Sequence, residues 1–365
     1  MSIKPGLTDY LAYGHRKGVD GQLPIWRQLI EMVLLFVYRQ NGPGYYMFGR
    51  FWRRDLPLRQ KLKHSSERSY KRRINELNDP RYQKISQHKI AEKALLKLFS
   101  MPTPEFLGFL SVSGGRSATG APLTTPQDLI DLLADRRPAA ICFKPVEGTC
   151  GVGFQATAIR CGDDSTAQLR PLPNGDWQSV ADFFNAYLQP AELATGYLVE
   201  EYLQQHPWYE QLNPDSVNTV RLYVIQSVSG QARVLGGYLR IGRVGSAVDN
   251  ATLGGIFCPI DVHTGVIGPA RFNTYDSDDF QRHPDSGLEL AGATLPCWDE
   301  IMALANRLLH IFPHTRFAGV DIAVGNNGPC VIELNVEPDR TAACDIDLPT
   351  IDMLDDRWDQ APDID

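Results

Sequence analysis

The stretch FAGVDIAVGNNGPCVIELN, residues 317–335, constrains the fold more than any other part of the chain. Two apolar runs flank a cluster of turn-forming residues at 325–329, a pattern that predicts a β-hairpin. If Asn327 is the centre of the turn, Asp321 and Glu333 face each other, because they are equally distant from it along the chain. Asn335 lies two residues beyond Glu333, so strand alternation places it on the same face.

The two acidic side chains of this hairpin suggest a metal site. Carboxylates directly across a ladder repel each other, so an apolar hairpin that places them there needs a positive charge between them. Oxygen ligands from Asp321, Glu333 and Asn335 suit Mg²⁺, which shares its remaining coordination with water and substrate phosphates. The alternative is that both acids face solvent and that Asn335 only ends a strand.

A second informative stretch is AICFKPVEGTCGVGF, residues 140–154. A short apolar strand carries Lys144, and the loop after it contains Gly148, Gly151 and Gly153. Glycines let backbone N–H groups approach a polyphosphate, and a lysine on the preceding strand supplies a fixed positive charge. The order of lysine and glycines differs from that of a Walker loop and of a protein kinase. An ordinary glycine-rich hairpin is the alternative.

Hydrophobic periodicity predicts further helices and strands. Helices are expected over 24–39, 50–75, 86–99 and 297–311, and strands over 196–203, 216–225 and 234–241. Arg221 and Arg240 lie within the last two strands. An arginine in an apolar strand is rarely fully buried without an anionic partner. Each is therefore expected either near a bound anion or in a salt bridge at a sheet edge.

Composition limits the classes of protein that this chain can be. Seven cysteines without a CxxC pair argue against a disulfide framework or a zinc site and fit a reducing, cytoplasmic location. The longest apolar run, Met32–Tyr38, is too short to span a bilayer, so no stable membrane insertion is expected. No nucleic-acid-binding motif is evident, and nucleic acid is not expected as a partner. The apolar face of the helix over 24–39 is expected to be a docking face or a homodimer contact rather than a membrane anchor.

The net charge of −7 hides a strong asymmetry. Residues 50–97 hold 15 Lys or Arg and five Asp or Glu, a local balance of +10. This region is expected to be a solvated basic face, or a surface for an anionic substrate or acidic partner. From Asp345 onward there are eight Asp and one Arg, which predicts a solvated, mobile acidic tail.

Taken in order along the chain, these features resemble the ATP-grasp superfamily over residues 86–340. The ordered series consists of Lys89, Lys144 with its glycine loop, the run Glu200-Glu201-Tyr202-Leu203, Arg221, and the hairpin DIAV…ELN. The segments HPWYEQLNPDSVNTVRL and DNATLGGIFCPID are most similar to the sugar-transfer-associated ATP-grasp subgroup. The resemblance implies an α+β fold in which two α+β subdomains clasp ATP, here with an N-terminal helical, basic extension.

The resemblance also implies which residues hold the nucleotide. Two lysines would contact the phosphates, Lys89 and Lys144. The flexible lid over the phosphates would contain Gly148, Gly151 and Gly153. The run from Glu200 to Leu203 would hold adenine, largely through the backbone of Glu201 and Leu203. The chain departs from the family after this run, because an acid that commonly holds the ribose would fall near Pro207. Either His206 or Glu210 would replace it, or neither would.

The resemblance places the metal and the chemistry in the second half of the chain. Asp321, Glu333 and Asn335 would ligate Mg²⁺, for which Mn²⁺ could substitute. Side chains near the transferred phosphate would be those of Arg221, Arg240 and Asn250. Many relatives have Pro-Gly after the position of Asn335, whereas this chain reads VEPDR, which leaves the shape of the acceptor side open.

The implied activity is ATP-dependent carboxylate–amine ligation, with an acyl phosphate as the intermediate. The substrates would be a small-molecule, peptide or sugar-derived carboxylate and an amine acceptor. The alternatives are a phosphotransferase that acts on a hydroxyl and a non-catalytic nucleotide-binding partner protein. The expected organisation is a helical basic region (1–85), a subdomain with the glycine-rich lid (86–203), a subdomain with the metal site (204–342) and an acidic tail (343–365).

Overall fold

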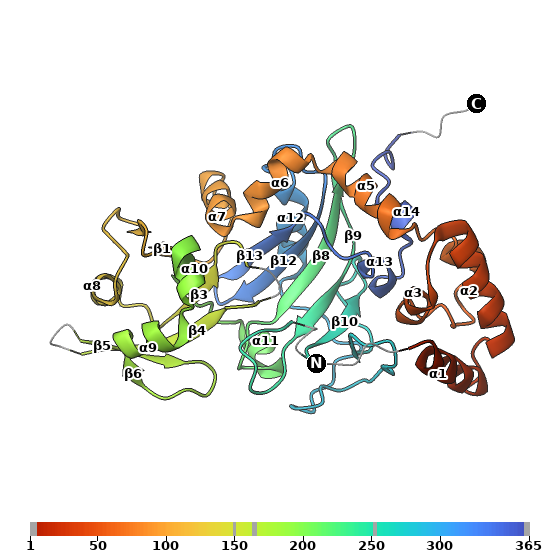
Figure 1. Cartoon of the computed structure of the whole chain (residues 1–365), viewed down its shortest axis with the longest axis horizontal. Helices are drawn as coiled ribbons and strands as arrows, with labels where there is room; N and C mark the ends of the chain where they lie inside the picture. Colours follow the sequence, from red (N-terminus) through yellow and green to blue (C-terminus); the bar gives the residue numbers. More distant parts are fainter. Residues whose placement is uncertain (1–5, 149–150, 163–165, 251–253, 361–365) are drawn as a thin grey trace.

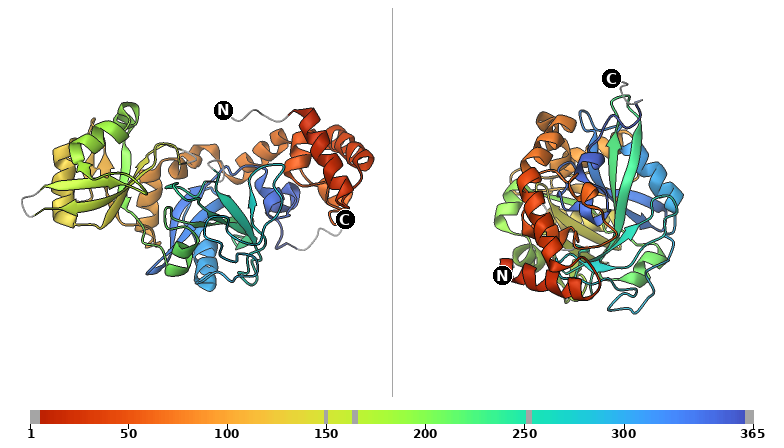
Figure 2. Two further views of the ribbon diagram at one scale, coloured as in Figure 1. Left: turned by 90° about the horizontal axis from the view of Figure 1, so that it is seen from below. Right: turned by 90° about the vertical axis from the view of Figure 1, so that its right-hand side faces the viewer.

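The structure, a computed structural model, describes residues 6–148, 151–162, 166–250 and 254–360. In these residues the strands form two antiparallel sheets, which lie next to each other along the molecule with the first helices at one end (Figures 1 and 2). The first sheet has the strand order β2-β1-β7-β3-β4-β5-β6, and the second has the order β11-β10-β9-β8-β12-β13.

The first sheet is built from residues 106–201 and is covered by short helices. Its strands are β1 (Phe106–Leu110), β2 (Arg116–Ser117), β3 (Ala140–Pro145), β4 (Gln155–Cys161), β5 (Ala167–Pro171), β6 (Gln178–Ser179) and β7 (Tyr197–Glu201). The helices are α8 (Pro126–Arg136), α9 (Val180–Tyr187) and α10 (Pro190–Thr195). Apolar side chains of these helices, such as Leu133 and Phe183, pack on Phe143 and Val199 of the sheet.

The second sheet has one apolar face and one face that carries charged side chains. Its strands are β8 (Thr219–Gln226), β9 (Ala232–Ile241), β10 (Ile256–Ile260), β11 (Arg271–Phe272), β12 (Phe317–Gly325) and β13 (Gly328–Asn335), and α11 (Pro207–Leu212) precedes β8. Val220 and Leu222 pack in the core formed with α12 (Trp298–Leu308). Strand alternation therefore places Arg221 and Tyr223 on the opposite face.

The strands β12 and β13 form the predicted hairpin, with a tighter turn than expected. Gly325 pairs with Gly328 across an Asn326-Asn327 turn, and Gly328 has a φ of +101°, which glycine adopts readily. The register then shifts at Ile332, so that Asp321 pairs with Glu333. A two-residue turn and one bulged residue together produce the same pairing as the predicted centre at Asn327.

The N-terminal helices fold around their own aromatic core. They are α1 (Leu7–Val19), α2 (Ile25–Arg39), α3 (Pro43–Phe48) and α4 (Leu58–Lys61). Next come α5 (Glu67–Leu77), α6 (Pro80–Gln87) and α7 (Lys89–Leu98), which run toward the two sheets (Figure 1). The helix predicted over residues 50–75 is therefore wrong in extent. Lys61 of α4 is buried against Glu31 at 2.6 Å, and a new helix begins only after Ser66, whose side chain accepts a hydrogen bond from the backbone of Ser69.

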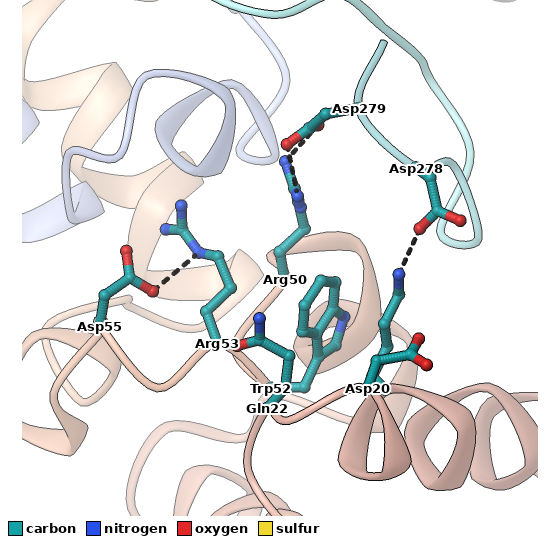
Figure 3. A pocket seen from close by; sticks show the side chains of 9 residues that line it. Asp20, Gln22, Arg50, Trp52, Arg53, Asp55, Asp278 and Asp279 are labelled. Carbon is teal, nitrogen blue, oxygen red and sulfur yellow. Dashed lines mark hydrogen bonds and ion pairs between the residues drawn. The ribbon is translucent and has the colours of Figure 1, made fainter.

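Ion pairs attach the N-terminal helices to the loop at residues 276–279. Arg50 pairs with Asp279 at 2.8 Å, and Lys17 pairs with Asp278. These residues and Trp52 line a pocket of about 470 Å³ between the helices and the loop (Figure 3). None of the residues that line the pocket belongs to a strand of the second sheet.

Much of the C-terminal segment up to residue 360 packs against the protein, so the prediction of a solvated, mobile tail is wrong for this packed part. Helices α13 (Ala342–Asp345) and α14 (Thr350–Met353) lie beside α5, and Met353 and Leu354 share a core with Ile74. Asp356 is 4% exposed. Asp356 is buried despite its charge, because its Oδ1 pairs with Arg73 Nη2 at 2.5 Å.

The basic and acidic regions of the chain pair with each other. Ion pairs that join them are Arg53–Asp347, Lys63–Asp352 at 2.9 Å and Arg73–Asp356 at 2.5 Å. The expectation of a largely solvated basic face therefore needs correction, since much of this charge is neutralised within the fold. The same contacts place α5, α13 and α14 over one end of the charged face of the second sheet.

Candidate active site

The hairpin brings the predicted metal ligands to one face of the second sheet. Asp321 pairs directly with Glu333, and Gly319 pairs with Asn335. Asp321 is buried, at 6% exposure, whereas Glu333 and Asn335 are half-buried. Leu334, between them, packs in the core on the other face. The geometry predicted for the two carboxylates is thus present.

Two arginines from neighbouring strands surround Asp321. Arg221 on β8 pairs with both oxygens of the carboxylate, with an Nη2–Oδ2 distance of 2.6 Å, and Arg240 on β9 donates to Oδ2 at 3.0 Å. Burial alone would raise the pKa of Asp321, but the two guanidinium groups hold it below its ordinary value. The repulsion expected between Asp321 and Glu333 is therefore offset by protein cations.

Arg240 also binds Asp249, a residue that the sequence did not single out as a partner. The Nη2–Oδ1 distance is 2.9 Å, and Asp249 accepts a hydrogen bond from the backbone N–H of Thr219 at 3.1 Å. Burial raises the pKa of Asp249 above its ordinary value although Arg240 acts against this. Asn250 follows directly in the chain, and its carbonyl accepts from the backbone N–H of Gly255 at 3.1 Å. Its place near a transferred phosphate stays a prediction.

Lys144 on β3 and Lys93 on α7 share one carboxylate, that of Glu200 on β7. Glu200 is 1% exposed, and its Oε2 lies 2.6 Å from Lys93 Nζ while Lys144 pairs with Oε1. Burial alone would raise the pKa of Glu200, but the two lysines lower it. Burial would lower the pKa of Lys144, yet Glu200 and the more distant Glu333 raise it. Lys144 therefore stays charged and acts electrostatically on the hairpin of the second sheet.

Helix α7 supplies two site residues that the sequence reasoning missed, Glu92 and Lys93. Glu92 is 3% exposed and accepts a hydrogen bond from the backbone N–H of Leu334 at 2.6 Å, which attaches α7 to β13. Burial and the charge of Glu333 raise its pKa well above the ordinary value. The available signal was the spacing of Lys89 and Lys93, which places both on one face of a helix.

The predicted lid loop contacts the other predicted phosphate lysine. Lys89 Nζ donates to the carbonyl of Gly148 at 2.6 Å. Gly151 and Gly153 have φ values of +72° and +73°, and a Cβ on Gly153 would lie 2.8 Å from the Pro145 ring, so a larger residue would not fit there. Thr149 and Cys150, between these glycines, lie outside the described residues.

The predicted adenine-binding run joins the two sheets. Glu201 ends β7 with an exposed side chain, and its backbone N–H donates to the carbonyl of Glu105 at 3.0 Å. Leu203 packs on the tip of the β12–β13 hairpin, where a Cβ on Gly325 would lie 2.8 Å from it. His206 caps α11 through its ring nitrogen, which accepts from the backbone N–H of Trp208 at 3.2 Å. The part of His206 or Glu210 in holding a ribose stays a prediction.

The oxygen atoms of Asp321, Glu333 and Asn335 are of the type that Mg²⁺ prefers, and strand pairing places these residues on one face of the hairpin. The Glu333 carboxylate forms no hydrogen bond or ion pair within the described residues, and Asn335 Oδ1 accepts from the backbone of Glu337 at 3.1 Å. Among all the residues that the structure describes, no group of three or more His, Cys, Asp or Glu side chains could hold a metal. A metal held here would therefore have two carboxylates and one amide, with water or phosphate oxygens as the remaining ligands.

Comparisons with known proteins identify the family. The family model of sugar-transfer associated ATP-grasp proteins matches residues 66–347, whereas no curated protein matches the chain. Similar solved structures include D-alanine–D-alanine ligase from Coxiella burnetii (14% identity, TM-score 0.38, 74% of this chain and 56% of that one). Others are D-alanyl-alanine synthetase A from Vibrio cholerae (12%, TM-score 0.40, 72% and 59%) and the ADP complex of N5-carboxyaminoimidazole synthetase from Staphylococcus aureus (10%, TM-score 0.37, 70% and 45%).

The chain thus spans about half the length of the solved structures that it matches. The family model covers most of the chain, including the predicted lid loop, the predicted adenine-binding run and the hairpin. The predicted ATP-grasp fold, an α+β fold with an N-terminal helical extension, is confirmed by this match together with the two antiparallel sheets. The chain belongs to the sugar-transfer associated ATP-grasp family.

Proposed function

We propose that this protein is an ATP-dependent, ADP-forming carboxylate–amine ligase. ATP would phosphorylate a substrate carboxylate, and an amine would then displace phosphate from the acyl phosphate to form an amide. This proposal rests on one observation: the carboxylates of the β12–β13 hairpin lie near a lysine of the first sheet. Asp321 and Glu333 face each other on the second sheet, and Lys144 of the first sheet lies within electrostatic reach of Glu333.

The cationic side chains suit phosphoryl transfer, which depends on positioning and charge neutralisation rather than on a protein nucleophile. Lys144 is held by Glu200, so its ammonium group is fixed before any nucleotide arrives. Arg221 and Arg240 are likewise fixed by Asp321, and they would stabilise charge that develops on a transferring phosphoryl group. Asn250 would lie beside them.

The oxygens of Asp321, Glu333 and Asn335 would hold Mg²⁺, with Mn²⁺ as a substitute. When bound, the metal supplies neutralisation of the phosphate oxygens. Asp321 would share its carboxylate between the metal and the two arginines, because a carboxylate can accept several contacts at once. Glu333 would be the ligand with fewer competing protein contacts.

The nucleotide would lie between the two sheets. Lys89 and Lys144 would contact its phosphates, and the backbone of Glu201 and Leu203 would contact adenine. The glycine loop with Gly148, Gly151 and Gly153 would exclude water from the acyl phosphate, which hydrolyses when solvent reaches it. Lys89 already contacts the carbonyl of Gly148, so movement of the loop and of this lysine would be coupled.

We also propose a cytoplasmic setting, in which ATP and reduced thiols are available. All cysteines in the described residues are free thiols. The substrates would be a small-molecule, peptide or sugar-derived carboxylate and an amine acceptor.

A screen for ADP release tests the proposed reaction. Purified protein is incubated with Mg²⁺, ATP and pooled carboxylates and amines, and the products are weighed by mass spectrometry. A ligase yields ADP, free phosphate and a condensed product that has lost water. A product that retains the phosphate would show a phosphotransferase instead, and ATP binding without consumption in the presence of cell extract would show a non-catalytic nucleotide-binding protein.

A further inference from the structure

Helix α2 presents a continuous apolar stripe to the surface of the protein. The stripe consists of large side chains that are between 43% and 66% exposed: Trp26, Leu29, Ile30, Val33, Phe36 and Val37. These residues recur at helical spacing, so they lie on one face over about three turns. Figures 1 and 2 show α2 at the outer edge of the molecule, at the opposite end from the first sheet.

The opposite face of the same helix is already used by the fold. Gln28, Glu31, Met32 and Leu35 are buried against the other N-terminal helices. The exposed stripe is therefore not required for the packing of this protein on itself. The stripe exposes on the order of 600 Å², at the upper end of the largest patches on monomeric proteins.

The charges around the stripe discriminate between the surfaces that could cover it. The acidic residue of α2, Glu31, is 2% exposed and paired with Lys61. Arg27, beside Trp26, is exposed although its Nε lies 3.4 Å from Glu31. Arg59 of α4 is exposed near the other end, where Arg39 donates to the carbonyl of Leu62. The charged residues of α2 other than the buried Glu31 are Arg27 and Arg39, so a second copy packed on this helix would place cations opposite cations. The stripe is also smaller than the about 800 Å² per partner of a standard interface.

We infer that α2 lies in the surface of an anionic lipid bilayer. The apolar stripe would enter the boundary between headgroups and acyl chains, and the arginines at its margins would meet lipid phosphates. Trp26 and Tyr38, near the two ends of the helix, are amphipathic rings of the kind found at this depth. No helix in the described residues is long and apolar enough to cross a membrane, and this binding does not need one. The occupant differs from the docking or dimer contact expected from the sequence.

Flotation with lipid vesicles tests the inference on the full chain. Wild-type protein is mixed with vesicles of phosphatidylcholine alone and with vesicles that also contain phosphatidylglycerol. The protein is expected to float with the mixed vesicles and to dissociate as salt is raised, because salt screens the arginines. Failure to bind the mixed vesicles would overturn the inference.

Two matched variants separate the stripe from general surface hydrophobicity. Val33→Glu, at a position 61% exposed, is expected to lower binding at least about tenfold, because a charge must enter the apolar region. Val112→Glu, at a position 53% exposed in the turn after β1, is expected to leave binding unchanged. Equal loss in both variants would contradict the assignment to α2.

A third variant tests the role of the charges. Arg27→Glu combined with Arg59→Glu is expected to remove the preference for phosphatidylglycerol. Light scattering measures whether the protein is a dimer, which is the competing explanation for the exposed stripe. If wild-type protein were a dimer that Val33→Glu dissociates, and neither bound vesicles, the stripe would be covered by a second copy and the inference would be wrong.

Discussion

At the scale of single residues, Glu200 of the first sheet supplies the negative charge for two lysines. Its carboxylate is buried and pairs with both Lys93 and Lys144. A buried carboxylate between two ammonium groups supplies the counter-charge for both and holds them in place. If it were neutral, two buried cations would be left close together without a counter-charge.

We therefore expect Glu200→Gln to destabilise the protein by about 3 kcal/mol, the loss typical when one partner of a buried ion pair is removed. Urea denaturation followed by fluorescence measures this. Glu105→Gln is the control, because the Glu105–Lys97 pair is exposed and its loss should cost less than about 1 kcal/mol. Equal effects in the two variants would show that the Glu200 network does not stabilise the fold.

Asp345 gives a prediction that depends on pH. Burial raises the pKa of this carboxyl to about 7, and Arg271 only partly opposes the shift. In the unfolded chain the group releases its proton near its ordinary value, so the folded state binds more protons between these two pH values. Stability therefore falls as pH rises from about 4 to about 7, by up to about 4 kcal/mol.

Asp345→Asn should remove this dependence, because an amide stays neutral as the protonated acid does. The variant is expected to match wild type near pH 4 and to exceed it in urea midpoint near pH 8. Asp355→Asn, at an exposed position, serves as the control. A wild-type protein more stable than Asp345→Asn at pH 8 would mean that the ionised carboxylate is favourable in the fold.

The residues of the site differ in how far the sequence could predict them. Asp321, Glu333 and Asn335 follow from strand alternation about a recognisable turn, a local rule that the fold obeys. Glu92 and Lys93 could not be separated from other polar positions of a helix, since their role depends on contacts with β13 and β7, which are distant in sequence. The roles of all these residues in binding ATP and metal remain predictions.

At the scale of elements, the C-terminal segment shows why composition misled the prediction. A run of aspartates indicates solvation only when no cations lie nearby in space, and composition does not report distance. Asp356 receives contacts from Arg73 on α5 and from Arg316 before β12. The segment therefore connects two elements that are far apart along the chain.

This connection predicts that Asp356→Asn lowers the free energy of unfolding by about 3 kcal/mol, because two arginines would lose a buried partner. Its neighbour Asp355 is exposed, so Asp355→Asn should change stability by less than about 0.5 kcal/mol. Thermal and urea unfolding of the two variants make the comparison. If neither substitution changed the free energy of unfolding, the expectation of a solvated tail would stand.

At the scale of the whole molecule, the basic residues and the exposed apolar side chains are concentrated in different parts of the protein. The +10 balance of residues 50–97 is offset in part by the acidic C-terminal segment and contributes in part to the candidate site through Lys89 and Lys93. The apolar surface that remains unpaired is concentrated on α2. The fold class could be predicted because the ordered motifs are local. The packing of the N-terminal and C-terminal segments against each other could not be predicted. The division of the chain at residues 85, 203 and 342 remains a prediction.

We expect the hairpin carboxylates to support ATP turnover, and the rate of ATP consumption by Glu333→Ala decides whether they do. The control is Glu337→Ala, which removes an exposed carboxylate four residues further along the chain. With substrates identified by the ADP-release screen, we predict that Glu333→Ala loses ADP release while its unfolding midpoint stays close to wild type, and that Glu337→Ala keeps activity. Wild-type rates of ADP release by folded Glu333→Ala would contradict the account.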